Sequence, residues 1–167
     1  MKATRVIGAS TAGGLLLFAA AVRLGAGDAE LFRLLILGTA LGALVAIDLA
    51  EHRIPNRIVL PASLACAALL AAEGVHPGQL AAGLAVVVVL LAMSLVWPAS
   101  FGMGDVKLAL LLVAGLGKVG VAALILGLAM AALFGGLLLL RYGPSASSRS
   151  LPLAPFLSSG AVAVVLL

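Results

Sequence analysis

The sequence predicts an all-α integral membrane protein, a polytopic helix bundle with about six to seven transmembrane helices. Hydrophobic residues make up 64% of the 167 residues, charged residues only 10%, and the mean hydropathy is +1.31. A soluble domain is roughly 45–50% apolar and about 25% charged, so this chain lacks the polar residues that a water-exposed surface requires. The composition excludes a soluble globular enzyme and a disordered chain. We expect residues 1–167 to form a single integral-membrane domain.

Seven apolar runs alternate with short breaks that carry nearly all the charge. The runs cover residues 6–22, 31–50, 58–72, 79–97, 105–117, 119–140 and 152–167. The third, fifth and seventh are short, near the lower limit for a full crossing, which takes roughly 20 residues. The fifth and sixth could instead form one long helix that breaks at Gly115, Gly117 and Gly120.

The first two runs differ in their sequence signals. The first follows Lys2 and Arg5 and is either a signal peptide or a retained helix; its length favours a retained helix. The second contains Gly38, Gly42 and Ala46, which are spaced four residues apart. Small residues at this spacing let helices approach closely, so we expect this stripe to be a packing surface.

The positive-inside rule sets the orientation. With the N-terminus in the cytoplasm and the spans alternating, seven basic residues lie inside and three outside. Those inside are Lys2, Arg5, Arg53, Arg57, Lys107, Arg141 and Arg149, and those outside are Arg23, Arg33 and Lys118. We therefore expect a multi-pass membrane protein whose 51–57 and 98–107 loops share the cytoplasmic face. Because these basic residues are scattered, the net charge of +4 predicts contacts with lipid headgroups and no nucleic-acid binding.

Asp48 is the acid that the composition least explains, because it interrupts the apolar run 44–50. A carboxylate there is costly, so it faces the bundle interior or a wet cavity, unless it is an interfacial acid that reaches the water at the helix end. Asp105 follows Gly102 and Gly104, at the start of the fifth run. Two glycines allow a tight turn and a close approach to another segment, and Pro98 is expected to end the preceding helix. Alternatively, Asp105 is an ordinary helix N-cap.

The two acids are more informative together than separately. Asp48 and Asp105 lie at the same end of neighbouring spans, where they can face one another. Two carboxylates that share a site cannot both ionise easily, and one ionised and one protonated acid is the arrangement of aspartic proteases. Such chemistry needs no metal and no cofactor, and we expect none. The sequence does not say which acid is the base.

Residues 48–56, with Asp48 followed by Pro55 and Asn56, resemble the first catalytic segment of the type IV prepilin peptidases. Residues 102–107 resemble the second segment of that family, Gly-x-Gly-Asp followed two residues later by a lysine. Residues 151–156 are similar to a proline-rich stretch near the end of the family's chains.

The resemblance implies an aspartic endopeptidase of the cell inner membrane that faces the cytoplasm and removes the basic leader of prepilins or pseudopilins. It also implies roles for seven residues. Asp48 and Asp105 match the catalytic pair, and Gly102, Gly104, Lys107, Pro55 and Asn56 match the active-site loops. Longer relatives carry an N-terminal cysteine-rich domain that methylates the product. This chain has one cysteine, Cys66, within an apolar run, so we expect a short form with peptidase activity and without methyltransferase activity.

Three other functions remain open. One is a different Gly-x-Gly-Asp protease of the signal-peptide-peptidase type, although its late Pro-Ala-Leu segment is absent and residues 153–155 read Leu-Ala-Pro. A small transporter coupled to protons or cations would also place acids in the membrane, near the midplane. An inactive scaffold for pilus assembly is the third. The oligomeric state and the identity of the pilin substrate do not follow from the sequence.

Overall fold

The computed structural model describes residues 2–23, 25–74, 77–97, 102–143 and 151–167, and in these ranges the chain is helical, as the composition predicts. The helices are α1 (Lys2–Arg23), α2 (Asp28–Glu51), α3 (Asn56–Ala72), α4 (Pro77–Val96), α5 (Met103–Leu116), α6 (Gly120–Tyr142) and α7 (Ala154–Leu166), with a short 3₁₀ turn η1 (Gly117–Val119) between α5 and α6. Their bounds agree with the seven apolar runs to within a few residues. Pro98, which we expected to end the fourth run, lies outside the described residues.

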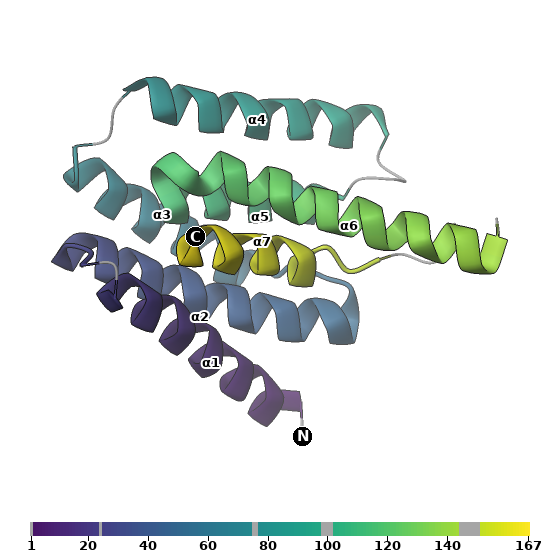
Figure 1. The fold of residues 1–167 in the computed structure, drawn as a ribbon, viewed down its shortest axis with the longest axis horizontal. Helices are drawn as coiled ribbons and strands as arrows, with labels where there is room; N and C mark the ends of the chain where they lie inside the picture. The colour runs from purple at the N-terminus through teal and green to yellow at the C-terminus, as the bar shows by residue number, and fades with distance from the viewer. Residues whose placement is uncertain (1, 24, 75–76, 98–101, 144–150) are drawn as a thin grey trace.

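Helix α5 is the centre of the bundle. It contacts α2, α3, α4, α6 and α7, and nearly all of it is buried from Val106 to Leu116. Figure 1 shows α4 along one side of the molecule and α1 with α2 along the opposite side, with α5, α6 and α7 between them. From Leu108 to Leu116 the helix carries only apolar residues, so this part has no polar face to turn toward water.

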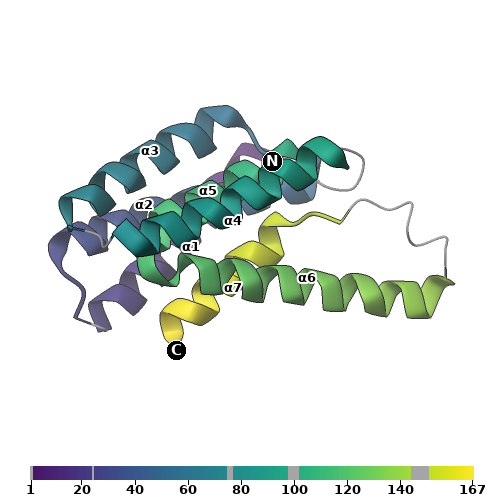
Figure 2. The ribbon, with the colours of Figure 1, turned by 90° about the horizontal axis from the view of Figure 1, so that it is seen from above.

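The chain reverses direction between α5 and α6. Gly117 adopts a left-handed backbone conformation with φ 55°, which glycine tolerates better than other residues. A Cβ on Gly120 would lie 2.9 Å from the Cα of Val113, so the two helices touch closely just beyond the turn. Figures 1 and 2 show α6 running back along the bundle from this turn. The alternative of one long broken helix is therefore wrong.

Helix α1 packs along α2 through backbone contact between glycines. A Cβ on Gly13 would clash with the carbonyl oxygen of Gly38 and would lie 3.2 Å from the Cα of Gly42. No side chain fits in such a gap, since real Cβ atoms do not come so close to backbone atoms. The prediction that the small-residue stripe of the second run is a packing surface is confirmed.

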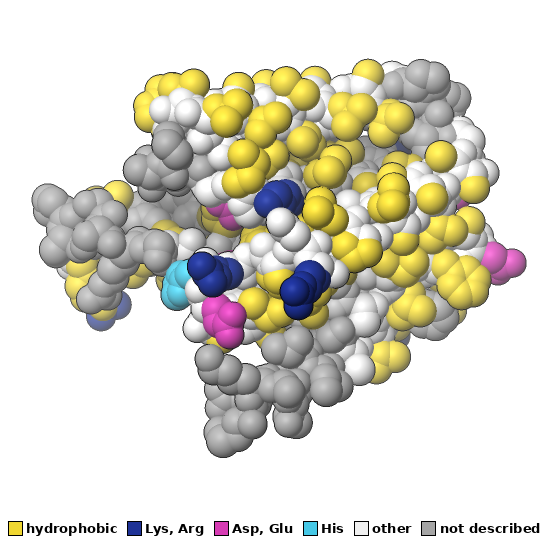
Figure 3. Space-filling view, turned by 180° about the vertical axis from the view of Figure 1, so that it is seen from behind, with side chains coloured by type: hydrophobic (Ala, Val, Ile, Leu, Met, Phe, Trp, Pro, Cys, Tyr) yellow, Lys and Arg dark blue, Asp and Glu magenta, His cyan; other side chains and the backbone are white. Residues whose placement is uncertain are grey.

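Two stretches are long and apolar enough to cross a membrane by themselves, Asp28–Glu51 and Met103–Tyr142, the second of which includes the turn η1. The other apolar helices are shorter. Large hydrophobic side chains remain exposed on several helices, including Leu64 at 74%, Leu133 at 75% and Leu140 at 88%. Exposed apolar side chains also cover much of the upper and right parts of the face shown in Figure 3, and a group of charged side chains with a histidine lies near its centre. These features fit a membrane protein, and a bundle of six to seven spans stays a prediction.

Candidate active site

Asp48 and Asp105 line the same cavity. Asp48 lies in the last turn of α2 and Asp105 in the first turn of α5, and these two helix ends meet at one end of the bundle. The cavity has a volume of about 510 Å³. Its walls come from the end of α2, the 52–55 loop and the start of α5: Ile47, Asp48, Glu51, His52, Arg53, Ile54, Pro55, Gly102, Gly104, Asp105 and Lys107. The expectation that the two acids lie at the same end of neighbouring helices is met.

The Asp48 side chain is buried. Only 6% of this residue is exposed, and its Oδ2 accepts a hydrogen bond from the backbone N–H of Ala154 at 3.1 Å. Ala154 is the first residue of α7, so the donor comes from a helix far along the chain. Of the two positions that the sequence left open for Asp48, the structure shows the one that faces the bundle interior.

Asp105 is the third residue of α5, and Gly102 is the N-cap residue of that helix. Asp105 Oδ2 accepts the N–H of Gly102 at 3.2 Å, and the Asp105 N–H in turn donates to the Gly102 carbonyl oxygen at 3.0 Å. Asp105 is therefore not the N-cap residue, although its carboxylate still satisfies a backbone donor at the start of the helix. In both Asp48 and Asp105, the side-chain Oδ2 accepts a hydrogen bond from a backbone N–H.

The two carboxylates interact electrostatically across the cavity. Among the described residues, no basic side chain forms an ion pair with Asp48 or Asp105. Two like charges in one partly enclosed site repel, so a proton shared between them lowers the energy. An arrangement of this kind can supply both a proton acceptor and a proton donor to one substrate.

Of the two glycines of the second segment, Gly104 has the close contact. A Cβ on Gly104 would lie 3.3 Å from the Cβ of Ile54, so the 52–55 loop packs directly against the start of α5. Gly102 has φ −79° and ψ 148°, an extended conformation that any residue adopts, and a Cβ there would meet Asp105 Oδ2 at an ordinary 3.4 Å. The tight turn that we expected to need both glycines is therefore not seen at Gly102.

A side-chain hydrogen bond joins the two segments. Lys107 Nζ donates to Asn56 Oδ1 at 2.8 Å. Asn56 begins α3, and Pro55 is the N-cap residue of that helix. The bond ties α5 to the start of α3, on the same side as the cavity, and leaves Asp105 without a cationic partner from Lys107.

His52 ends α2 rather than continuing it. Its backbone is left-handed with φ 50°, and its N–H donates to the carbonyl oxygen of Asp48 at 2.9 Å. The left-handed residue terminates the helix and turns the chain into the 52–55 loop. His52 lines the cavity.

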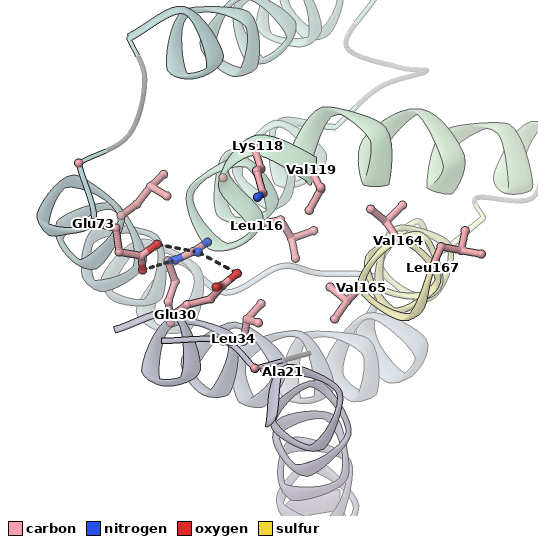
Figure 4. Close-up of a pocket in the computed structure, with 16 residues that line it drawn as sticks. Ala21, Glu30, Leu34, Glu73, Leu116, Lys118, Val119, Val164, Val165 and Leu167 are labelled. Atoms are coloured by element: carbon pink, nitrogen blue, oxygen red, sulfur yellow. Dashed lines mark hydrogen bonds and ion pairs between the residues drawn. The ribbon is translucent and has the colours of Figure 1, made fainter. Parts of the chain in front are cut away.

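The opposite end of the bundle holds a second polar cluster, which the sequence analysis missed. Arg33 is 3% exposed, and its guanidinium donates to both carboxylate oxygens of Glu73 at 3.0 Å and to the Gly115 carbonyl oxygen at 2.6 Å. Glu30 adds an ion pair at 3.7 Å. Figure 4 shows Glu30 and Glu73 pointing toward the guanidinium between them, beside a cavity of about 480 Å³ that Lys118 also lines.

The sequence carries a signal for the contact of Arg33 with Glu73 but none for the hydrogen bond from Ala154 to Asp48. Arg33 interrupts the second apolar run and Glu73 ends the third, so an opposite-charge pair on neighbouring spans could have been inferred from the same rule that singled out Asp48. Instead we treated Arg33 as a topology signal only. The donor from Ala154 has no side-chain signal at all, because any residue except proline has a backbone N–H.

The structure is thus a bundle of apolar helices with two carboxyl groups in one cavity at its end. The model of the type IV leader peptidase family matches residues 35–140 of the chain. The match covers more than half of the chain and includes both Asp48 and Asp105. The chain therefore belongs to the type IV leader peptidase family, a family of membrane peptidases. No curated protein and no solved structure matches it significantly.

Proposed function

We propose that this chain is an aspartic endopeptidase that cleaves the basic leader from prepilins or pilin-like proteins, with Asp48 and Asp105 as its catalytic pair. The observation that carries the proposal is the placement of both acids in one cavity, on helix ends that are more than 50 residues apart in the sequence. Membership of the family supports a peptidase and a prepilin-type substrate.

The reaction follows from the properties of two neighbouring carboxyl groups. The ionised acid takes a proton from water as the water oxygen attacks the peptide carbonyl carbon, and the protonated acid donates to the carbonyl oxygen. The carbon–nitrogen bond then breaks as the amine nitrogen receives a proton. Water and two carboxyl groups are sufficient for this sequence.

The loops around the acids support this role by their contacts. The Gly104–Ile54 contact and the bond from Lys107 to Asn56 hold the 52–55 loop and the start of α3 against α5. Both contacts fix the distance between the segments that carry Asp48 and Asp105. Positioning of this kind contributes to catalysis because a misplaced reacting group lowers the rate steeply.

We further propose that the protein is a multi-pass inner-membrane protein whose catalytic end faces the cytoplasm. Lys107, Arg53 and Arg57 lie around this end, whereas Arg33 and Lys118 lie at the other. The excess of basic residues on one side predicts that this side is cytoplasmic. A transporter site is expected near the membrane midplane, so the position of both acids at one end of the bundle favours the peptidase.

Cleavage in membranes tests the proposal. A prepilin-like protein from the same genome would be co-expressed with wild type, Asp48→Asn, Asp105→Asn and Asp28→Asn. Asparagine keeps the shape of the side chain but removes its proton chemistry, so we expect cleavage by wild type and by Asp28→Asn and none by the other two. Asp28 is the matched control because it is exposed and lies at the opposite end of α2. Cleavage by Asp48→Asn or Asp105→Asn, at normal protein levels, would contradict the assignment.

A further inference from the structure

The first turn of α7 delivers a backbone donor to Asp48. The Ala154 N–H donates to Asp48 Oδ2 at 3.1 Å, and both partners are buried. The first N–H groups of a helix have no partner within the helix, so they are available to a carboxylate, and the helix dipole favours negative charge at that end. Ala154 lies beyond the region that the family model matches.

Close packing against α6 holds this donor in place. A Cβ on Gly160 of α7 would lie 2.7 Å from the backbone nitrogen of Gly127 and 2.5 Å from the carbonyl oxygen of Ala123, both on α6. Leu157, one turn after Ala154, is 1% exposed. Helix α7 also contacts α2 and α5, the two helices that carry the acids. The donor therefore belongs to a packed helix and not to a surface loop.

The two acids differ in the environment of their hydrogen bonds. The bond from Gly102 to Asp105 is exposed, whereas the bond from Ala154 to Asp48 is buried. Both acids lie near a helix N-terminus, Asp105 in the first turn of α5 and Asp48 against that of α7. A hydrogen bond to a carboxylate favours the ionised form, and it does so more strongly where water does not compete. Burial alone disfavours an ionised carboxylate, and the Ala154 N–H offsets that cost at Asp48 because it donates where water does not compete. The other charged or titratable groups that line the same cavity are Glu51, His52, Arg53 and Lys107.

We propose that the Ala154 N–H is a positioning group that keeps Asp48 ionised, so that Asp48 is the general base and Asp105 the general acid. This assignment rests on the proposed peptidase function. In the first step Asp48 accepts a proton from water, the water oxygen bonds to the substrate carbonyl carbon, and the Asp105 proton moves to the carbonyl oxygen. In the second step Asp48 gives its proton to the leaving nitrogen, the carbon–nitrogen bond breaks, and a hydroxyl proton returns to Asp105.

A titration without substrate tests the assignment directly. The chain has three aspartates, Asp28, Asp48 and Asp105, so protein labelled with ¹³C at the aspartate carboxyl carbon gives three signals. Loss of one signal in Asp28→Asn and of another in Asp48→Asn assigns them. In purified full-length protein in detergent micelles, we expect the Asp48 signal to titrate at lower pH than the Asp105 signal. If Asp105 loses its proton first, the proposal is overturned.

An amide-to-ester change isolates the role of the N–H. Ala154→lactate, introduced by nonsense suppression, removes this N–H and keeps the side chain. We expect the Asp48 titration to move upward by about one to two pH units, as expected for loss of a hydrogen bond to a charged group. The matched control is Ala29→lactate, the same change in the first turn of α2 at the other end of the bundle, which should leave all three titrations in place. An unmoved Asp48 signal in the Ala154 ester contradicts the proposal.

The same ester separates the two roles in catalysis. If Asp48 is the base, the low-pH limb of the kcat/KM profile for a prepilin-derived peptide shifts to higher pH, and the high-pH limb does not shift. If Asp48 is the acid, only the high-pH limb moves, and the assignment is wrong. A wild-type protein that cleaves no prepilin peptide would contradict the proposed function, whereas the titration would still decide whether Ala154 keeps Asp48 ionised.

Discussion

The two ends of the bundle hold similar numbers of charged groups but arrange them in opposite ways. Around Arg33, the guanidinium lies between Glu30 and Glu73, and both ion pairs join opposite charges. At the other end, Asp48 and Asp105 share a cavity in which only backbone N–H groups donate to them among the described residues. About 22 Å of α2 separates Arg33 from Asp48, given the rise of a helix. Charges paired with each other join helices together, whereas like charges kept together raise the energy of the folded state and point to chemistry.

The largest effect on stability is expected at the Arg33 end. Glu73→Gln keeps the shape of the side chain but leaves the Arg33 guanidinium buried without a counter-charge from α3. Breaking a buried pair on one side costs about 3 kcal/mol, so the unfolding temperature in detergent should fall clearly. Asp28→Asn removes a carboxylate from an exposed site on the same helix end as Arg33 and should leave it unchanged. Equal melting of Glu73→Gln and wild type would show that the pair does not stabilise the bundle.

At the catalytic end, the contact between Gly104 and Ile54 should affect activity more than stability. Gly104→Val pushes branched carbons into Ile54 and displaces the 52–55 loop, so we expect roughly tenfold slower prepilin cleavage. The matched control is Gly136→Val on α6, where a Cβ would meet nothing within 4 Å. If both valine variants cleave at the wild-type rate, the loop does not position the acids.

The smallest effect is expected for Lys107. Lys107→Met keeps much of the side-chain length but loses the hydrogen bond to Asn56. This hydrogen bond is exposed. A single hydrogen bond of this kind contributes about 1 kcal/mol, or roughly a fivefold change in rate. The double variant with Asn56→Ala should be no slower than Lys107→Met alone, because both changes remove the same bond. Additive losses in the double variant would mean that Lys107 acts through another group.

Much of this arrangement follows from the sequence because it depends on side-chain chemistry and helix length. The apolar run 31–50 predicts α2 to within a few residues, and the position of Asp48 and Asp105 at matching ends of their runs predicts that they meet. Gly38 is recognisable as a packing position because small residues recur every four residues around it. Each of these inferences uses the local sequence pattern together with the alternating direction of successive membrane spans.

The remainder depends on tertiary contacts that leave no local pattern. The donor to Asp48 is a backbone group of Ala154, which lies 106 positions further along the chain. The need for glycine at position 104 comes from Ile54, and nothing in the second segment alone distinguishes Gly104 from Gly102. The hydrogen bond from Arg33 to the Gly115 carbonyl oxygen uses a backbone acceptor on another helix, so it becomes visible only when those helices are packed together.

The central claim is that one end of the bundle carries chemistry and the other stability, and two variants measured side by side test it most directly. Asp105→Asn and Glu73→Gln each neutralise one carboxylate, and both would be assayed for thermal unfolding in detergent and for prepilin cleavage per folded molecule. Opposite results are expected: Asp105→Asn abolishes cleavage and leaves the unfolding temperature unchanged, because asparagine keeps an oxygen acceptor for the Gly102 N–H and breaks no ion pair. Glu73→Gln lowers the unfolding temperature and retains cleavage. Loss of stability in Asp105→Asn as large as that in Glu73→Gln, or cleavage that persists in Asp105→Asn, would contradict the account.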